Sequence, residues 1–87
     1  MKIIYSLQFK QEYRRLPDNI KRKAEKKEKI FRENPFASQL KTHKLGGRLA
    51  EFWSFSIDYR YRIIFEFVDE KKVILHAVGD HSLYKKL

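Results

Sequence analysis

The chain is short, strongly basic and free of cysteine. Its 87 residues include 20 Lys and Arg against 11 Asp and Glu, a formal net charge of +9. This length fits one small domain, residues 1–87, and excludes a two-domain enzyme or a solenoid. Without Cys there is no disulfide framework or thiolate metal site, and the three dispersed His lack a zinc-ligand spacing. The apolar stretches are too short to span a bilayer or form a signal peptide, so we expect a cytoplasmic domain with no membrane partner.

The positive charge predicts an anionic partner. Phosphate backbones are the commonest partners of a small surface with this much charge, so nucleic acid is the leading class. An anionic membrane surface or an acidic protein would be attracted by the same field, and composition does not choose among the three.

The N-terminal part of the chain predicts one strand and two helices. Residues 2–5 mix β-branched and aromatic types as a strand does, and Ser6 can cap the helix that follows. That helix has apolar residues at i, i+4 and i+7, namely Phe9, Tyr13 and Leu16. Pro17 stops it, and Asp18 is the expected N-cap of a second helix that runs to about Asn34.

The remainder of the chain predicts strands. Residues 51–57, 60–67 and 72–78 have strand-like apolar patterns, with reversals at Asp58 and at 69–71. The expected fold is α+β, with two N-terminal helices packed on one face of a small, mostly antiparallel four-stranded sheet. This arrangement allows the first strand to pair parallel with a later one.

One predicted strand has a charged face opposite its apolar face. Arg60, Arg62 and Glu66 share this face. Arginine can hold a phosphate through two parallel hydrogen bonds, so the face is a candidate anion site. An ordinary solvated sheet face with an Arg–Glu pair across it explains the same pattern.

The C-terminal segment holds a second candidate. His81 lies just past the last predicted strand, and histidine titrates near neutral pH, so His81 is a candidate general acid or base. Asp80 can orient its ring or raise its pKa, and Tyr84 can stack on a nucleobase. A terminal segment that only caps the core with Leu83 and Tyr84 explains the same residues.

Two further histidines have different interpretations. His43 lies between Lys41 and Lys44, just before a pair of glycines, where these side chains can grip a substrate backbone or belong to a solvated loop. His76 interrupts an apolar strand and is interpreted as a structural histidine.

The second predicted helix is the most basic segment. A run of cations of this kind suits phosphate contacts, although a solvated helix face has the same composition. No phosphate-binding loop, paired-carboxylate signature, nucleophile elbow or metal-ligand cluster is present in the sequence.

Short motifs occur in a fixed order along nearly the whole chain. They are Ile3-Ile4-Tyr5-Ser6-Leu7-Gln8-Phe9, Leu16-Pro17, Asn34-Pro35-Phe36, His43-Lys44-Leu45-Gly46-Gly47, Trp53-Ser54, Arg62-Ile63-Ile64-Phe65 and Val78-Gly79-Asp80-His81-Ser82-Leu83-Tyr84. Their order and spacing resemble the RelE/ParE superfamily of toxins from toxin–antitoxin operons, and are most similar to its RelE/StbE, YoeB and YafQ branches.

This resemblance implies an endoribonuclease that cleaves mRNA in the ribosomal A site by acid/base attack of the 2′-hydroxyl, without metal or cofactor. It also implies a heteromeric complex with a cognate antitoxin that keeps the toxin inactive. The residues it points to for RNA and ribosome binding are Arg60, Lys41, Lys44, Arg48, Lys23, Lys26 and Lys27.

The resemblance also implies catalytic roles. Arg62 matches an arginine of the YoeB-like pattern that supports the transition state, and His81 matches a histidine used in proton transfer. Tyr84 lies near the aromatic residue that follows that histidine, and His43 resembles a histidine of the YafQ branch. No residue clearly matches the carboxylate base of the YoeB-like branch, so the identity of the general base stays open.

Two other functions fit the same resemblance. A ParE-like toxin would poison DNA gyrase without an RNase centre, and a non-catalytic remnant would bind antitoxin and RNA without cutting.

Overall fold

The computed structural model describes residues 1–86, with the side chain of Lys86 excepted. Its strands and helices follow in the order β1 (Lys2–Tyr5), α1 (Leu7–Arg14), α2 (Asp18–Glu33), β2 (His43–Lys44), β3 (Trp53–Ser56), β4 (Arg62–Asp69), β5 (Lys72–Gly79) and α3 (Leu83–Lys86). Two short 3-10 turns flank β2, η1 (Ser38–Leu40) and η2 (Gly47–Leu49). No helix within residues 1–86 is long and apolar enough to cross a membrane.

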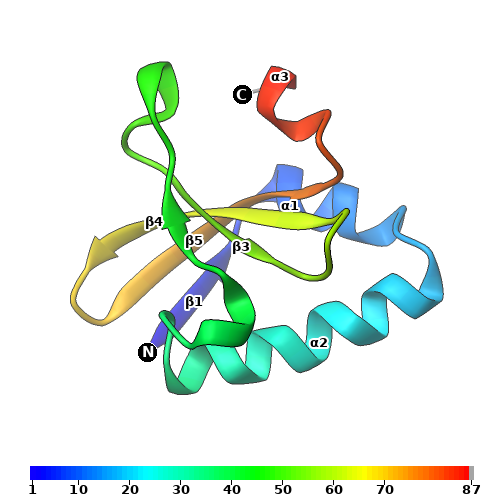
Figure 1. The fold of residues 1–87 in the computed structure, drawn as a ribbon, viewed down its shortest axis with the longest axis horizontal. Helices are drawn as coiled ribbons and strands as arrows, with labels where there is room; N and C mark the ends of the chain where they lie inside the picture. The colour runs from blue at the N-terminus through cyan, green and yellow to red at the C-terminus, as the bar shows by residue number, and fades with distance from the viewer. Residues whose placement is uncertain (87) are drawn as a thin grey trace.

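The strands form one sheet with the order β1-β5-β4-β3-β2 (Figure 1). β1 pairs parallel with β5, and every other neighbouring pair is antiparallel. The predicted α+β class is therefore confirmed, but the expected four strands are five. The missed strand is β2, which has 2 residues and is too short to show an alternating pattern.

The N-terminal helices begin close to their predicted signals. Ser6 caps α1 as expected, because its Oγ accepts the N–H of Phe9 at 3.0 Å. α2 starts at Asp18 itself, so the prediction that Asp18 is the N-cap is wrong by one residue. Pro17 takes the N-cap position, since its carbonyl already accepts the N–H of Lys21 at 3.0 Å.

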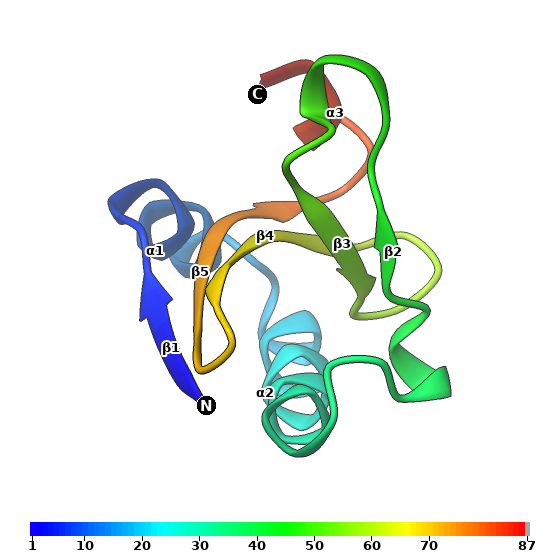
Figure 2. The same cartoon turned by 90° about the vertical axis from the view of Figure 1, so that its left-hand side faces the viewer.

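Both N-terminal helices cover one face of the sheet and bury the core there (Figure 2). Phe31 of α2 is fully buried, with its ring stacked on Phe55 of β3 at 4.6 Å and edge-on to Phe65 of β4 at 4.9 Å. Such aromatic contacts, added to the burial of apolar area, fix α2 against the middle of the sheet.

We call the opposite side of the sheet the open face. It is formed by the side chains of alternate residues in the central strands, Ser54, Ser56, Arg62, Ile64, Glu66 and Ala77. A small apolar cluster of Ile64, Ala77 and Leu83 lies on it. Figures 1 and 2 show α3 and the η2 loop standing above this side, with α2 on the other.

Candidate functional site

Strand register places two predicted site residues on the open face. His43 pairs with Ser54, and Ser54 pairs with Ile64 on its other side. Two residue pairs further along the sheet, Arg62 lies between Ser56 and Gly79. Because residues directly opposite each other in a sheet project to the same side, His43 and Arg62 share this face.

Backbone carbonyls hold the Arg62 guanidinium at the start of β4. Its Nη1 donates to the carbonyls of Asp58 and Tyr61, the second at 3.2 Å, and the side chain is half-buried. Arginine has five N–H donors, so anchoring through Nη1 still allows Nη2 and Nε to bind an anion. The geometry therefore provides a cation whose position is fixed before any ligand arrives.

The turn that anchors Arg62 is organised by the Asp58 carboxylate. Its Oδ1 accepts the backbone N–H groups of Arg60 at 2.9 Å and Tyr61 at 2.8 Å, and Lys23 Nζ lies 3.5 Å from Oδ2. Partial burial raises the pKa of Asp58, but these N–H groups and Lys23 together lower it below its usual value. The ionised carboxylate thus stabilises the turn that presents Arg62.

His43 is oriented by its own backbone. The ring Nδ1 donates to the carbonyl of Lys41 at 3.0 Å, and Lys41 adopts a left-handed conformation with φ of 51°. In the neutral ring this bond places the proton on Nδ1 and leaves Nε2 as a proton acceptor. An exposed acceptor nitrogen on the open face is the chemistry that a general base needs.

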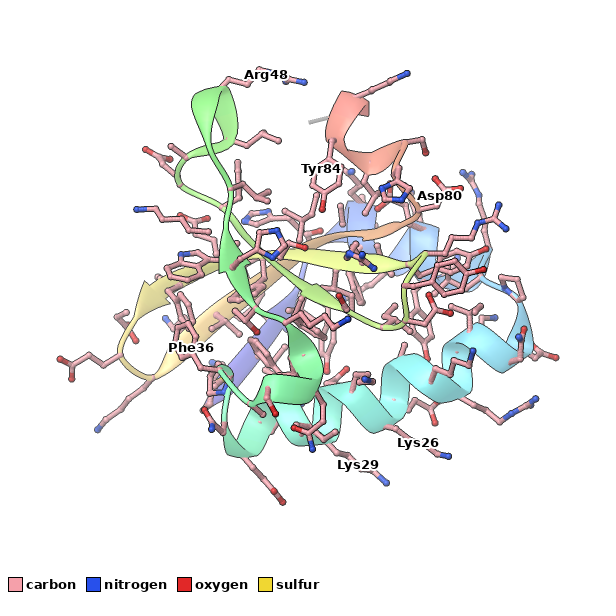
Figure 3. All side chains as sticks on the ribbon, viewed as in Figure 1. Lys26, Lys29, Phe36, Arg48, Asp80 and Tyr84 are labelled. Atoms are coloured by element: carbon pink, nitrogen blue, oxygen red, sulfur yellow. The ribbon has the colours of Figure 1, made fainter. Side chains whose placement is uncertain are left out.

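α3 brings Tyr84 to the same region. Figure 3 shows its side chain directed from α3 toward the sheet, and its hydroxyl lies 3.5 Å from Ser54 Oγ. Arg48, at the tip of the η2 loop, donates through Nη2 to the Tyr84 carbonyl at 2.9 Å. Leu83 is only 2% exposed and packs against Gly79, which secures α3 over the end of β5.

His81 is exposed in the connection between β5 and α3, two residues beyond the Gly79 that pairs with Arg62. The Asp80 carboxylate accepts the N–H of Ser82 at 3.0 Å and lies 3.9 Å from Arg60 Nη2. The Ser82 N–H lowers the pKa of Asp80. Asp80 therefore supports the turn and faces Arg60, and His81 is also among the groups that lower its pKa.

Two further predicted cations lie outside the row of residues that forms the open face. Lys44 pairs with Trp53, whose side chain packs against the helix-covered core, so Lys44 is on the other side of the sheet from His43. Arg60 lies outside β4, in the turn before it, and pairs with Asp80. Lys44 is therefore not placed to act beside Arg62, whereas Arg60 is paired with Asp80 next to the Gly79 that pairs with Arg62.

The predicted cations of α2 are also away from the open face. Lys23 contacts Asp58, and Lys27 Nζ donates to the carbonyl of Gln39 at 3.2 Å. Figure 3 shows Lys26 and Lys29 on the side of α2 that faces away from the sheet. The molecule therefore separates its basic helix from the face that carries Arg62 and His43.

Sequence reasoning missed a polar pair on the open face. Glu66 Oε1 lies 2.9 Å from His76 Nε2, so the Arg–Glu pair considered for this face is replaced by a His–Glu pair. His76 occupies an irregularity of β5, since Phe65 pairs with Leu75 while Ile64 pairs with Ala77. The available signal was a single polar residue inside an otherwise apolar strand.

The described residues 1–86 contain no group of three or more His, Cys, Asp or Glu side chains close enough to hold a metal ion. The candidate site consists of a cation, two histidines and a tyrosine, with serines of β3 beneath them.

Comparison with known proteins gives one family and a set of similar folds. A family model described as the ParE toxin of the type II toxin-antitoxin system parDE matches residues 3–83. No curated protein matches.

Several solved structures have the same fold. A YoeB/ParE toxin from Agrobacterium tumefaciens is 21% identical with a TM-score of 0.77, covering 93% of this chain and 99% of its own. The DinJ-YafQ toxin-antitoxin complex from E. coli is 17% identical with a TM-score of 0.76, and the match covers 94% of this chain and 93% of its own. A YoeB-YefM complex from Staphylococcus aureus is 20% identical with a TM-score of 0.74, and the match covers 93% of this chain and 97% of its own. At these identities the similarity establishes the fold.

Proposed function

Because the chain belongs to the ParE toxin family of type II toxin–antitoxin systems, we propose that it is a ribosome-dependent endoribonuclease that cleaves mRNA in the A site. The family match confirms the superfamily expected from the sequence. The observation that carries the nuclease proposal is the placement of Arg62, His43 and Tyr84 on one side of the sheet. That side is not covered by α1 or α2. Its centre is buried under α3, and His43, Arg62 and Glu66 stay at least partly exposed around that centre.

The reaction uses groups that this face offers. A base removes the proton of a 2′-hydroxyl, and that oxygen attacks the adjacent phosphorus. The bond to the 5′-oxygen breaks, and an acid protonates this oxygen as it leaves. The products are a 2′,3′-cyclic phosphate and a 5′-hydroxyl, and the protons balance because the base gains one from the 2′-hydroxyl while the acid gives one to the 5′-oxygen.

Each proposed role follows from a position in the fold. His43 is the base, since its Nδ1 is occupied by Lys41 and its Nε2 is an acceptor. Arg62 stabilises the charge that develops on the phosphoryl oxygens, because its guanidinium is already fixed by the turn. His81 is the acid, and Tyr84 stacks on a base or hydrogen-bonds to the substrate.

The cations serve binding in this proposal. Lys41 and Arg48 lie on either side of β2 in the chain and bind the mRNA backbone, Arg60 lies in the turn before β4, and Lys44 contacts RNA from the other side of the sheet. Lys23, Lys26 and Lys27 contact ribosomal RNA from the opposite side of the molecule. A net charge of +9 would make this association strongly dependent on salt.

The partner we propose is a cognate antitoxin that binds the toxin in the cytoplasm. YafQ and YoeB, which share this fold, have been solved in complexes with DinJ and YefM. An acidic segment, disordered or helical before binding, would neutralise the basic surface and block the open face.

A second candidate function is poisoning of DNA gyrase. It is favoured by one observation, that the matching family is described as the ParE toxin of parDE. A non-catalytic binder of antitoxin and RNA would retain the same fold.

Primer extension on a defined mRNA with translating ribosomes tests the proposal. We expect cuts at A-site codons that disappear when ribosomes are omitted and when the nucleotide at the cut carries 2′-deoxyribose. Absence of cuts with folded protein, together with inhibition of purified gyrase, would replace the nuclease by the gyrase poison. Absence of both activities would leave the non-catalytic binder.

A further inference from the structure

The His–Glu pair lies at the end of the open face away from Arg62. Glu66 Oε1 and His76 Nε2 are 2.9 Å apart, and their side chains are 35% and 27% exposed. Glu66 is four residues beyond Arg62 on the same side of β4, a separation of about 13 Å along a strand. Both groups are therefore accessible on the face that we propose receives RNA, but apart from the reacting phosphate.

A carboxylate is an unusual group for such a surface. It repels the phosphates that the rest of this chain attracts, so it weakens binding unless it makes a favourable contact of its own. His76 balances part of this charge when protonated. The remaining lone pairs of Glu66 accept hydrogen bonds from a ligand that offers donors.

Aromatic surface lies beside the carboxylate. The half-buried Phe52 ring is 5.1 Å from the His76 ring at an interplanar angle of 82°. Phe52 also packs against the apolar cluster of Ile64 and Ala77, so its position is fixed by the sheet. Bases of single-stranded RNA bind proteins by stacking on such rings while their edges form hydrogen bonds.

The backbone holds His76 in place. At the irregularity of β5 its carbonyl accepts the hydroxyl of Ser6 at 3.0 Å, and Ser6 is itself fixed as the N-cap of α1. The N–H of Val78 donates to Glu12 Oε1 at 3.0 Å, so a side chain of α1 also holds the part of β5 that follows His76. These contacts make the irregularity a rigid part of the fold.

We propose that Glu66, His76 and Phe52 form a binding site for a guanine base of the same RNA strand, apart from the scissile phosphate. Guanine presents two neighbouring donors on its Watson–Crick edge, N1–H and the N2 amino group, and a carboxylate accepts both. Adenine, cytosine and uracil each present one donor beside acceptors, which a carboxylate repels. This inference rests on the proposed function for the RNA-binding role of the open face.

The test uses oligonucleotides that cannot be cut. The full chain is titrated with fluorescent 2′-fluoro uridine tracts that carry one central guanosine or, in its place, inosine, which lacks only the N2 amino group. We expect the wild type to bind the guanosine tract roughly tenfold more tightly, as a two-bond contact to a base edge provides.

Glu66→Gln is the decisive variant, because its amide oxygen can still accept from His76 while its amide nitrogen cannot accept from guanine. We expect it to lose the preference. Glu70→Gln, an identical change of charge at an exposed residue of the β4–β5 turn, should keep it. Thermal unfolding of both variants checks that the fold is retained.

Equal binding of the two tracts by the wild type, including no measurable binding to either, would overturn the guanine site. A preference for the guanosine tract that survives in folded Glu66→Gln would also overturn the guanine site. The outcome is independent of catalysis: a chain that prefers guanosine but never cuts mRNA would retain this site and lose the nuclease proposal. A chain that cuts mRNA but shows no preference for guanosine would retain the nuclease proposal and lose the guanine site.

Discussion

The two faces of the sheet are built on different principles. The helix-covered face buries Phe31, Phe55 and Phe65, each 0% exposed, and its contacts are apolar and tightly interlocked. The open face carries hydroxyl, guanidinium, imidazole and carboxylate groups, each held by one or two hydrogen bonds. The first face holds the larger apolar core and supplies most of the stability of the fold, whereas the second positions polar groups around the small apolar cluster of Ile64, Ala77 and Leu83.

This difference implies that stability and activity can be altered separately. Substitutions on the helix-covered face should unfold the domain, whereas substitutions on the open face should change chemistry or binding in a folded protein. The expected effects decrease from the aromatic core, through the turn and α3 that support the site, to the outer surface of α2.

Phe31→Ala should have the largest effect on stability. Truncation removes the stacked and edge-on contacts with Phe55 and Phe65 and leaves a cavity between α2 and the sheet. Such truncations cost roughly 3–5 kcal/mol, a large part of the stability of a domain of this size. Urea unfolding measures the loss. A cost near zero would show that the helix-covered face does not dominate stability.

Asp58→Ala should destabilise the turn that holds Arg62, by roughly 2 kcal/mol from hydrogen bonds to a charged acceptor. The pKa of Asp58 is lower in the folded state, so its contribution is present above its unfolded pKa and lost as pH falls through the folded value.

Urea unfolding at pH 7 and at lower pH tests this. The difference in unfolding free energy between wild type and Asp58→Ala should be largest at pH 7 and shrink below about pH 4. Asp58→Asn keeps an acceptor for the Tyr61 N–H, so its unfolding free energy at pH 7 should lie between those of the wild type and Asp58→Ala. A difference that grows on acidification would contradict the assigned role.

Gly79→Ala should loosen α3 at a smaller cost in stability. A Cβ at this position would lie 3.1 Å from Leu83 Cδ2, so Leu83 and the helix that carries Tyr84 must shift. Overpacking of this kind costs roughly 1–3 kcal/mol. Hydrogen exchange of α3 should become faster than in Gly46→Ala, where an added Cβ meets nothing within 4 Å. Equal exchange in both variants would show that α3 is not secured through Gly79.

Lys26→Ala should change stability least. Its side chain is on the outer surface of α2, so the unfolding free energy should change by less than about 0.5 kcal/mol. If α2 contacts ribosomal RNA, the slope of log affinity for ribosomes against log salt should fall by roughly 0.7–0.9. Lys71→Ala, at the exposed β4–β5 turn, is the control. An equal fall of this slope in both variants would show that the salt dependence comes from net charge and not from a contact through α2.

The sequence predicted the helix-covered face well because that face is periodic. Phe55 lies between two serines, large apolar residues recur at every second position of β4, and Ser6 and Pro17 mark the helix boundaries. The open face was harder to predict because its geometry depends on register. β2 has only 2 residues, and its register decides that His43 pairs with Ser54 on the open face while Lys44 lies on the other side of the sheet.

Pairing between distant segments carries no local signal. The contact of Glu66 with His76 depends on an irregularity in β5, and Tyr84 lies near Ser54 on a helix that is held by Leu83 against Gly79 and by Arg48. Arg62, by contrast, could be identified from alternation alone, since the strand period places it opposite the apolar side chains. Its anchoring by the Asp58 and Tyr61 carbonyls became visible only in the structure.

The most direct test of the nuclease proposal is the single-turnover rate of mRNA cleavage on ribosomes by Arg62→Ala, compared with Arg22→Ala on the exposed surface of α2. Both variants lose one guanidinium, but only the first removes the cation from the open face. We predict a loss of roughly a hundredfold or more for folded Arg62→Ala at saturating protein, and a rate near that of the wild type for Arg22→Ala. Equal rates in the two variants would contradict the assignment of the open face as the reaction surface.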